Sequence, residues 1–400
     1  MPIGPNILAQ SKLPLTFEVI NPGDIGIEPP ENRIGDSLRT WVRSLSVFQK
    51  EAIVASSRTG LVWRLASDEG PYLDGHDEAS CPLSFLTVGM IASYMNEIMA
   101  LAKQQELVIR QIRLIQDNYY TMEGSMRKRT MVGGALPVEL TVEIDCDLDD
   151  AALNALLLNA IAASPINGLM RGKLESLFAL SKNSCQIELG KSKPIEGLLY
   201  GDPENKFDGY EAKGSVLNEP IVEPVGVTPK KEIPGGTSAA GSSLADEQSR
   251  TLNIGGICTL REDGIKEITQ LQYSPHGTSF KLLSEEAEVN GGMGRAPDAN
   301  TYISAGVAFC FMTQFGRFVK MLDLDLKEYR VVQDSYFSLG GASGGTGQAG
   351  TAHPLETHVY LETNESDDVA REMLDISEQT CFLHAFCRTD MKTKLRVVRL

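Results

Sequence analysis

Two long apolar segments dominate the hydrophobic pattern of the chain, at about residues 83–105 and 300–322. Apolar residues occupy most of the faces that a helix would present there, and a helix of that kind has to be buried. Before each segment, over 51–66 and 254–283, apolar and polar residues alternate between turn residues, as is typical of β-strands. We therefore predict that strands precede a buried helix in each half of the chain.

After each buried helix, the pattern predicts two strands, a second helix and a last strand. The expected strands are 108–120, 138–144 and 184–189 in the first half, and 326–337, 356–361 and 394–400 in the second. The second helices are expected to start near Asp149 and Ser366, and a serine followed by two aspartates suits a helix N-cap. This order of elements indicates the α+β fold class for both halves.

The second half repeats the first at a constant offset of 217 residues, and no gap is needed between residues 60 and 171. The matched pairs include Gly60 with Gly277, Gly89 with Gly306, Lys103 with Lys320, Gly133 with Gly350, and Arg171 with Arg388. Chance supplies isolated identities, but it does not supply a constant offset that also aligns the hydrophobic pattern. We therefore predict a tandem duplication.

Glycine, proline, serine and charged residues punctuate the chain in two places, before about residue 31 and between about 201 and 250. Such a composition is typical of arms, linkers and surface excursions. We accordingly expect four parts in the chain. They are an N-terminal arm over 1–34, a first domain over 35–200, a linker over 201–250, and a second domain over 251–400.

Composition narrows the class of protein. The chain has 400 residues, a hydrophobic fraction of 42% and a net charge of −16. An acidic surface repels the phosphate backbone and anionic lipids, so we expect neither a nucleic-acid partner nor a membrane partner. The sequence shows neither a signal peptide nor an uninterrupted apolar run of transmembrane length, and we expect a cytoplasmic protein.

The seven cysteines show no Cys-x-x-Cys spacing, which argues against a zinc ribbon, and we expect no disulfide framework in a reducing compartment. Two of them stand out, because each predicted helix of the second half carries one, Cys310 and Cys381. Shifted back by 217, these positions are Ser93 and Ser164. The first half therefore has two serines where the second half has two cysteines, and the separation is 71 residues in both. Two readings are open at this point, a redox pair or two inert core cysteines.

The residues around these cysteines resemble the motifs of the OsmC/Ohr family (osmotically inducible protein C and organic hydroperoxide resistance protein). The family's first motif, Asn-Pro-Glu-x-Leu-x-x-Ala-x-x-x-x-Cys, resembles residues 298–310 and, in the first half, 81–93. Its second motif, Ala-x-x-Cys-Pro-x-Ser, keeps the cysteine at Cys381 in the second half and the proline in the first half. The motif glutamate falls on Asn300 and Leu83, so neither half has it.

The resemblance implies two OsmC-like domains, each a sheet with a long buried helix and a second helix, packed as an intramolecular pseudo-dimer. It implies reduction of organic hydroperoxides in a stress response, with Cys310 as the attacking residue and Cys381 as the resolving one. A small apolar hydroperoxide would be the substrate, and a thiol reductant such as a lipoyl or dithiol protein would restore the pair. We expect no metal site and no other cofactor, and further self-association of the chain is left open.

Family members also use an arginine that orients the hydroperoxide and favours the thiolate. The candidates for this role are Arg64, reaching across the domain interface, and Arg295, which is closer to the cysteine helix in sequence. A different enzyme on the same fold remains an alternative, because His384 lies three residues after Cys381 and could serve as base for a cysteine nucleophile in a hydrolase or lyase. A third alternative is a non-catalytic module that binds an apolar ligand between the domains.

Overall fold

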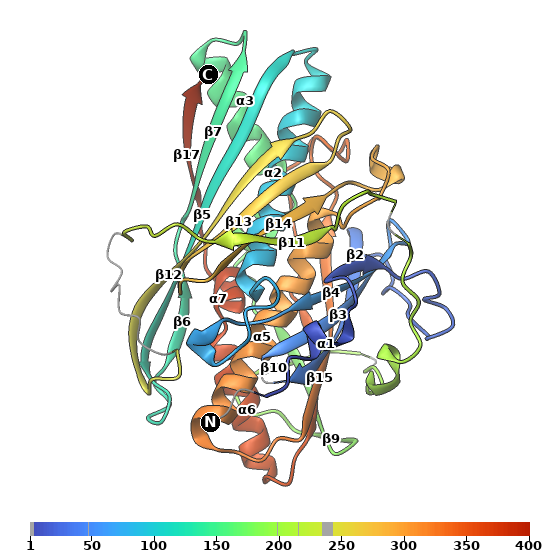
Figure 1. Ribbon diagram of the computed structural model, residues 1–400, viewed down its shortest axis with the longest axis vertical. Coiled ribbons are helices and arrows are strands. Elements are labelled where there is room, and N and C mark those ends of the chain that lie inside the picture. Colours follow the sequence, from blue (N-terminus) through green and yellow to red (C-terminus); the bar gives the residue numbers. More distant parts are fainter. Residues whose placement is uncertain (1–3, 47, 198, 215, 234–242) are drawn as a thin grey trace.

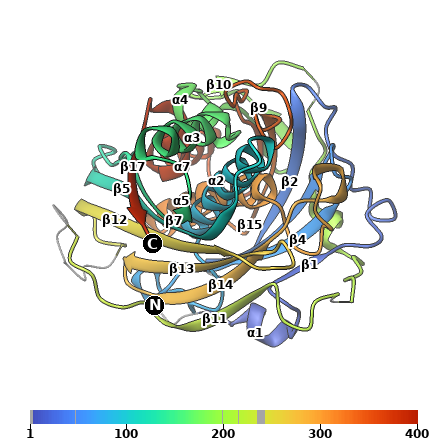
Figure 2. The ribbon, with the colours of Figure 1, turned by 90° about the horizontal axis from the view of Figure 1, so that it is seen from above.

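Two β-sheets curve around two long central helices in the computed structural model, which describes residues 4–400 except 47, 198, 215 and 234–242 (Figures 1 and 2). The central helices are α2 (Pro82–Gln104) and α5 (Ala299–Leu322). The remaining α-helices are α1 (Ile7–Ser11), α3 (Asp150–Ala163), α4 (Ile166–Arg171), α6 (Asp367–Thr380) and α7 (Phe382–Arg388). Three short 3-10 helices are η1 (Pro71–Leu73), η2 (Glu204–Phe207) and η3 (Glu288–Asn290). The mixed α+β class predicted from the sequence is confirmed.

The first sheet has the strand order β1-β4-β3-β2-β15-β16-β8-β10, with β9 paired to β8. Its strands are β1 (Thr16–Glu18), β2 (Gly35–Ser46), β3 (Gln49–Ser56), β4 (Val62–Ser67), β8 (Leu177–Lys182), β9 (Cys185–Ile187), β10 (Lys193–Pro194), β15 (Glu328–Ser338) and β16 (Glu356–Glu362). The second sheet has the order β11-β14-β13-β12-β5-β7-β17, with β6 paired to β5. Its strands are β5 (Ile109–Ser125), β6 (Val132–Ala135), β7 (Val138–Cys146), β11 (Val222–Val227), β12 (Glu247–Leu260), β13 (Lys266–Ser274), β14 (Thr278–Ser284) and β17 (Thr393–Arg399).

Each sheet contains strands of both halves of the chain. In the first sheet, β2 of the first half pairs with β15 of the second. In the second sheet, β12 of the second half pairs with β5 of the first. The two sheets thus have the same order of elements with the halves exchanged, and neither half closes a sheet by itself.

The central helices pack against each other through two glycines that the repeat aligns. A Cβ atom on Gly89 would lie 2.6 Å from the carbonyl oxygen of Ala299, and one on Gly306 would lie 2.9 Å from the amide nitrogen of Leu86. Only glycine allows backbones to approach so closely. The helix α2 is long and apolar enough to cross a membrane by length and composition, yet 78% of its most apolar window is buried inside the protein, as a core helix requires.

The second helix of each half, α3 or α6, begins where the sequence predicts. The predicted helix of the second half was expected to carry Cys381, but α6 ends at Thr380. Asp149 and Ser366 cap α3 and α6 by accepting hydrogen bonds from the backbone of the first turn. Both helices then break, at Ser164 and at Cys381, where the backbone is extended. In the second half, Arg388 donates to the carbonyl groups at the end of α6, which partly satisfies the acceptors that the break leaves open.

Three expectations need correction. The strand of the first half that corresponds to β17 at the offset of 217 is β8, whereas the predicted range 184–189 contains the short return strand β9, which pairs with β8. The region expected as a linker is folded in part, because β11 pairs with β14, and β12 begins at Glu247; the rest of it includes 234–242, which lie outside the described residues. The N-terminal arm contains α1 and β1, and β1 joins the edge of the first sheet at β4.

A buried histidine in the first sheet makes a prediction about acid stability. The ring nitrogens of His358 lie 3.0 Å from the Ser181 hydroxyl and 2.8 Å from the Tyr360 hydroxyl, and burial lowers the pKa of His358 to about 4. A lowered folded-state pKa contributes stability above the unfolded pKa near 6.5, and this contribution is lost as the pH falls towards 4. It amounts to at most about 3 kcal/mol.

We therefore expect the free energy of unfolding to fall between pH 6.5 and pH 4.5, as measured with urea, and to fall less in His358→Gln. His353→Gln, which replaces a partly exposed histidine, serves as the control. An unchanged pH slope in His358→Gln would exclude this histidine as the source.

Candidate active site

The two cysteines singled out by the repeat lie together in the core. Cys310 is in the middle of α5, and Cys381 occupies the break between α6 and α7. Their sulfur atoms are 3.4 Å apart and hydrogen-bonded, and both side chains are buried. A disulfide requires a sulfur–sulfur distance of about 2.05 Å, so a small movement of the side chains suffices to form one.

The first half repeats this geometry with serines. Ser93 lies in α2, Ser164 occupies the break between α3 and α4, and their hydroxyl oxygens are 2.7 Å apart. A glycine of the opposite half packs against each break. A Cβ on Gly133 would lie 2.4 Å from the carbonyl oxygen of Thr380, and one on Gly350 would lie 2.0 Å from that of Ser164. The protein therefore contains two similar sites, and one of them carries thiols.

The two thiols have unequal acidities. Burial and the neighbouring sulfur raise the pKa of Cys310 well above its usual value. Burial also opposes ionisation of Cys381, but its hydrogen bond with Cys310 and its contact with His384 outweigh burial, so the pKa of Cys381 lies well below its usual value. The first proton to leave the pair therefore leaves its charge on Cys381, and the second thiol is held protonated beside it.

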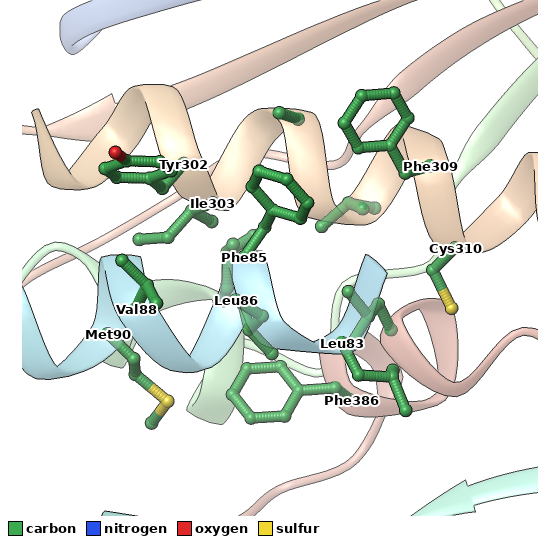
Figure 3. Close-up of a cluster of buried hydrophobic side chains, with 14 of the residues drawn as sticks. Leu83, Phe85, Leu86, Val88, Met90, Tyr302, Ile303, Phe309, Cys310 and Phe386 are labelled. Atoms are coloured by element: carbon green, nitrogen blue, oxygen red, sulfur yellow. The ribbon is translucent and has the colours of Figure 1, made fainter. Parts of the chain in front are cut away.

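A small cavity adjoins Cys310, with a volume of about 30 Å³. Cys310, Thr313, Gln314 and Arg317 line it from one face of α5, as the spacing of three, four and seven residues requires. Figure 3 shows the sulfur of Cys310 directed towards α7, with Leu83 of α2 close by. The cavity has room for a water-sized group only, so a larger ligand has to displace the surrounding side chains.

Buried charged side chains surround this cavity. Glu69 accepts hydrogen bonds from Thr313 at 2.8 Å and from Tyr72 at 2.5 Å. Lys50 donates to the same Thr313 hydroxyl at 2.9 Å. Because burial penalises the charged forms, the pKa of Glu69 is raised and that of Lys50 is lowered. A carboxylate and an ammonium group are thus connected through the Thr313 hydroxyl of the cysteine helix, one turn after Cys310.

Arg64 and Arg295 are not brought to the cysteine pair. Arg64 lies on the face of β4 that points away from the central helices, where it pairs with Glu51 at 2.8 Å and lies over the ring of Phe17. Its neighbours in β4 face the helices instead, because side chains alternate along a strand. Arg295 precedes α5, which itself begins about three turns before Cys310, and it pairs with Glu285 at 2.7 Å.

The cations that do reach the cavity are Arg317 and Arg250, which the sequence analysis missed. Arg317 follows Cys310 by seven residues, a spacing that places both on one helix face and could have revealed it. Glu69 could have been noticed because the repeat aligns it with Glu286. Arg250 offers no such local signal, since it arrives from the start of β12.

His384 contacts the pair but is poorly placed as a general base. Its ring packs against Phe311 at a centroid distance of 5.1 Å and against Phe178 at 5.6 Å. Its contact with Cys381 lowers the pKa of that thiol, but among the described residues no other group hydrogen-bonds to either ring nitrogen. A cysteine nucleophile activated by histidine normally relies on a third group that orients the ring, and the part of the chain that the structure describes provides none here.

Residues 292–396 match the family model described as OsmC-like protein. This segment is an OsmC-like domain. It contains both Cys310 and Cys381, whereas Ser93 and Ser164 lie outside the matched range. Among solved structures, a crystal structure of an OsmC-like hydroperoxide resistance protein from Jannaschia sp. CCS1 is similar over 32% of this chain and 79% of that chain, with 19% identity and a TM-score of 0.21. Comparison with curated proteins gives no match.

The two residues that stand at the position of the family's motif glutamate line different cavities, and neither is acidic. In the OsmC-like domain this position is Asn300, which donates to Asp36 at 3.1 Å in the cavity next to Ser93. Its counterpart in the first half, Leu83, lines the cavity next to Cys310. Glu69 is the carboxylate that lines the thiol cavity instead.

Proposed function

We propose that this protein reduces organic hydroperoxides with the Cys310–Cys381 pair and uses an external thiol as reductant. The observation that carries the proposal is the placement of two thiols 3.4 Å apart, with one of them facing a cavity that the buried Arg317 and the partly buried Arg250 line. Nearby positive charge favours a thiolate, which is the nucleophile in such reactions. The OsmC-like domain that contains both cysteines supports the same chemistry.

The proposed reaction proceeds in two steps. The Cys381 thiolate takes up the proton of Cys310, and the Cys310 thiolate attacks the outer oxygen of the hydroperoxide. The O–O bond breaks, Cys310 becomes a sulfenic acid, and the alkoxide leaves as an alcohol after protonation. Cys381 then attacks the sulfenic sulfur, forming the disulfide and releasing water. Reduction of this disulfide by a dithiol, such as a lipoyl or dithiol protein, restores both thiols.

We further propose that the two halves are duplicated OsmC-like domains that form an internal pseudo-dimer. The exchanged strand orders of the two sheets, the aligned glycines of the central helices and the matched serine and cysteine pairs support this arrangement. In this arrangement the serine half has lost the thiols and still supplies strands and cavity residues to the other half. Glu69 and Leu83 are examples of such cavity residues.

Titration of the reduced protein with cumene hydroperoxide tests the proposed function. We expect one disulfide per chain after one equivalent, and mass spectrometry of a digest should locate it between Cys310 and Cys381. Cys185→Ser provides a control, because Cys185 is exposed and lies outside the cavity.

An absence of reaction with organic hydroperoxides, or a disulfide between other cysteines, would contradict the proposed function. Hydrolysis of an ester through an acyl-enzyme at Cys381 would instead favour the hydrolase alternative. Binding of an apolar ligand without turnover, in the larger cavity of about 680 Å³ that Leu15, Phe17 and Trp63 help to line, would favour the non-catalytic alternative.

A further inference from the structure

Two arginines in the thiol cavity lack a carboxylate partner. Arg317 is buried, and it donates to the carbonyl oxygen of Ser243 at 2.8 Å and to Gln314 at 3.4 Å. Arg250 donates to the hydroxyl of the same Ser243. Both arginines line the cavity beside Cys310. Neither forms an ion pair within the described residues, in contrast to most of the arginines that the structure describes.

Each of these guanidinium groups also keeps a buried nitrogen without a hydrogen-bond partner. The nitrogens are Nη2 of Arg317 and Nε of Arg250, judged among the residues that the structure describes. Burial lowers the pKa of Arg317 to about 9, helped by the charge of Arg250, and burial lowers that of Arg250 to about 10. A buried charge without a partner is destabilising, and two such charges that repel each other are more so.

The carboxylate of Glu69 lies nearby but forms no ion pair with Arg250 or Arg317. Glu69 lines the same cavity, but its hydrogen bonds go to Thr313 and Tyr72. Lys50, also buried nearby, adds another positive charge, so the cations beside the cavity outnumber the lining carboxylate. The corresponding cavity of the serine half has the opposite character, with four acidic side chains in its lining, Asp36, Glu97, Glu286 and Asp298.

We propose that Arg250 and Arg317 form an anion subsite that binds a carboxylate group of the substrate next to Cys310. Each guanidinium donates its unused hydrogen bond to one carboxylate oxygen. This inference rests on the proposed function and specifies its substrate class, a small hydroperoxide that carries a carboxylate a few bonds from the –OOH group. Arg317 follows Cys310 by two helical turns, and its side chain leans back towards the helix N-terminus and thus towards Cys310. The carboxylate and the –OOH group of the ligand therefore have to be close together.

Binding can be tested without any turnover. The probe is 3-hydroxy-3-methylbutanoate, the alcohol that reduction of 3-hydroperoxy-3-methylbutanoate would yield, and the protein is the full chain with Cys310→Ser and Cys381→Ser. We expect millimolar probe to raise the melting temperature of this variant, while tert-butanol, which lacks the carboxylate, leaves it unchanged. Adding Arg317→Gln or Arg250→Gln should abolish the shift, and Arg113→Gln, which alters an exposed arginine elsewhere, should retain it.

Catalysis provides the second measurement. For the native chain we expect kcat/KM for 3-hydroperoxy-3-methylbutanoate to exceed that for tert-butyl hydroperoxide by about 10- to 100-fold, the usual contribution of hydrogen bonds to charged groups. Arg317→Gln should bring the ratio of the two kcat/KM values close to one, and this ratio does not depend on any loss of thiolate that lowers both rates together.

Several results would overturn the inference. One is a melting-temperature shift with sulfate or phosphate and none with the carboxylate, which would indicate a site for an inorganic anion. Another is a carboxylate shift that survives both arginine substitutions. If the probe binds through the arginines while no hydroperoxide is reduced, the anion subsite stands and the proposed function fails. If tert-butyl hydroperoxide is reduced and the probe does not bind, the proposed function stands and the subsite fails.

Discussion

Replacing Cys310 with serine is expected to lower the rate of hydroperoxide reduction by at least about 1,000-fold, because a hydroxyl at this position stays protonated and is a far weaker nucleophile than a thiolate. The fold should be retained, since the serine pair Ser93–Ser164 already occupies the equivalent position in the first half. Stopped-flow measurement of hydroperoxide consumption with a dithiol reductant gives the rate, and a melting curve checks the fold.

The companion variant Cys381→Ser separates the roles of the two sulfurs. With Cys310 as the attacking residue, this variant should accumulate a sulfenic acid on Cys310 that a dimedone probe labels. Labelling of Cys381 in the Cys310→Ser variant would reverse the assignment, and the lower pKa of Cys381 makes this reversal a real alternative. Full activity in Cys310→Ser would exclude the proposed chemistry.

The serine half offers a matched control for the environment of the pair. In a chain with Cys310→Ser and Cys381→Ser, the substitutions Ser93→Cys and Ser164→Cys rebuild a thiol pair between acidic side chains. Neighbouring carboxylates raise the pKa of a thiol, whereas positive charge beside a thiol favours its thiolate form. We expect the transplanted pair to react with hydroperoxide at least about 100-fold more slowly than the native pair. Equal rates would show that the cations of the native site are not needed.

Substituting Gly89 with alanine is expected to destabilise the protein by about 2–3 kcal/mol, the upper part of the range of about 1–3 kcal/mol found for overpacked cores. The new Cβ would lie 2.6 Å from both the carbonyl oxygen of Ala299 and the side chain of Ile303, so α2 and α5 would have to move apart. Any separation of these helices disturbs both sheets, because strands of both halves are packed around them. Urea unfolding followed by circular dichroism measures the change.

Gly201→Ala is the control for this prediction, since a Cβ at Gly201 meets no atom within 4 Å and its φ is not positive. Gly306→Ala should resemble Gly89→Ala more closely than it resembles Gly201→Ala. A change below about 0.5 kcal/mol in Gly89→Ala, the usual range for surface substitutions, would mean that the helix crossing adjusts freely.

The two cavities differ in charge, which gives a physical reason for the proposal that only the cysteine pair reacts with hydroperoxide. One cavity contains thiols, arginines and Lys50 nearby, and the other contains hydroxyls and four carboxylates. In a symmetric dimer of identical chains, both cavities would have the same lining. In a duplicated chain the two cavities are encoded by different residues, so their linings can differ. Strands of both halves still pair within each sheet.

Local patterns in the sequence were sufficient for several features of the fold. The two buried helices follow from apolar residues on most faces, and the starts of α3 and α6 follow from the side-chain caps Asp149 and Ser366. The spacing of 71 residues pointed to Cys310 and Cys381 as a pair, and the structure places them in contact. The alternation of side chains along β4 also predicted that Arg64 does not reach the thiols. Arg64 stands between Trp63 and Leu65, which face the core around the central helices, so its side chain points away from that core.

Only the tertiary structure decided which residues surround the thiols. Arg250 comes from the start of β12, Glu69 from beyond β4 of the other half, and Arg317 from the cysteine helix itself. The break at Cys381 was also not apparent, since Phe382 replaces the proline that marks the break in the first half. The sequence by itself determined the two central helices, the starts of the second helices, the repeat and the cysteine pair, because these depend on residues that are near neighbours or that recur at one offset. The pairing of strands across the halves, and with it the charge around Cys310, depends on contacts between distant segments that no local pattern encodes.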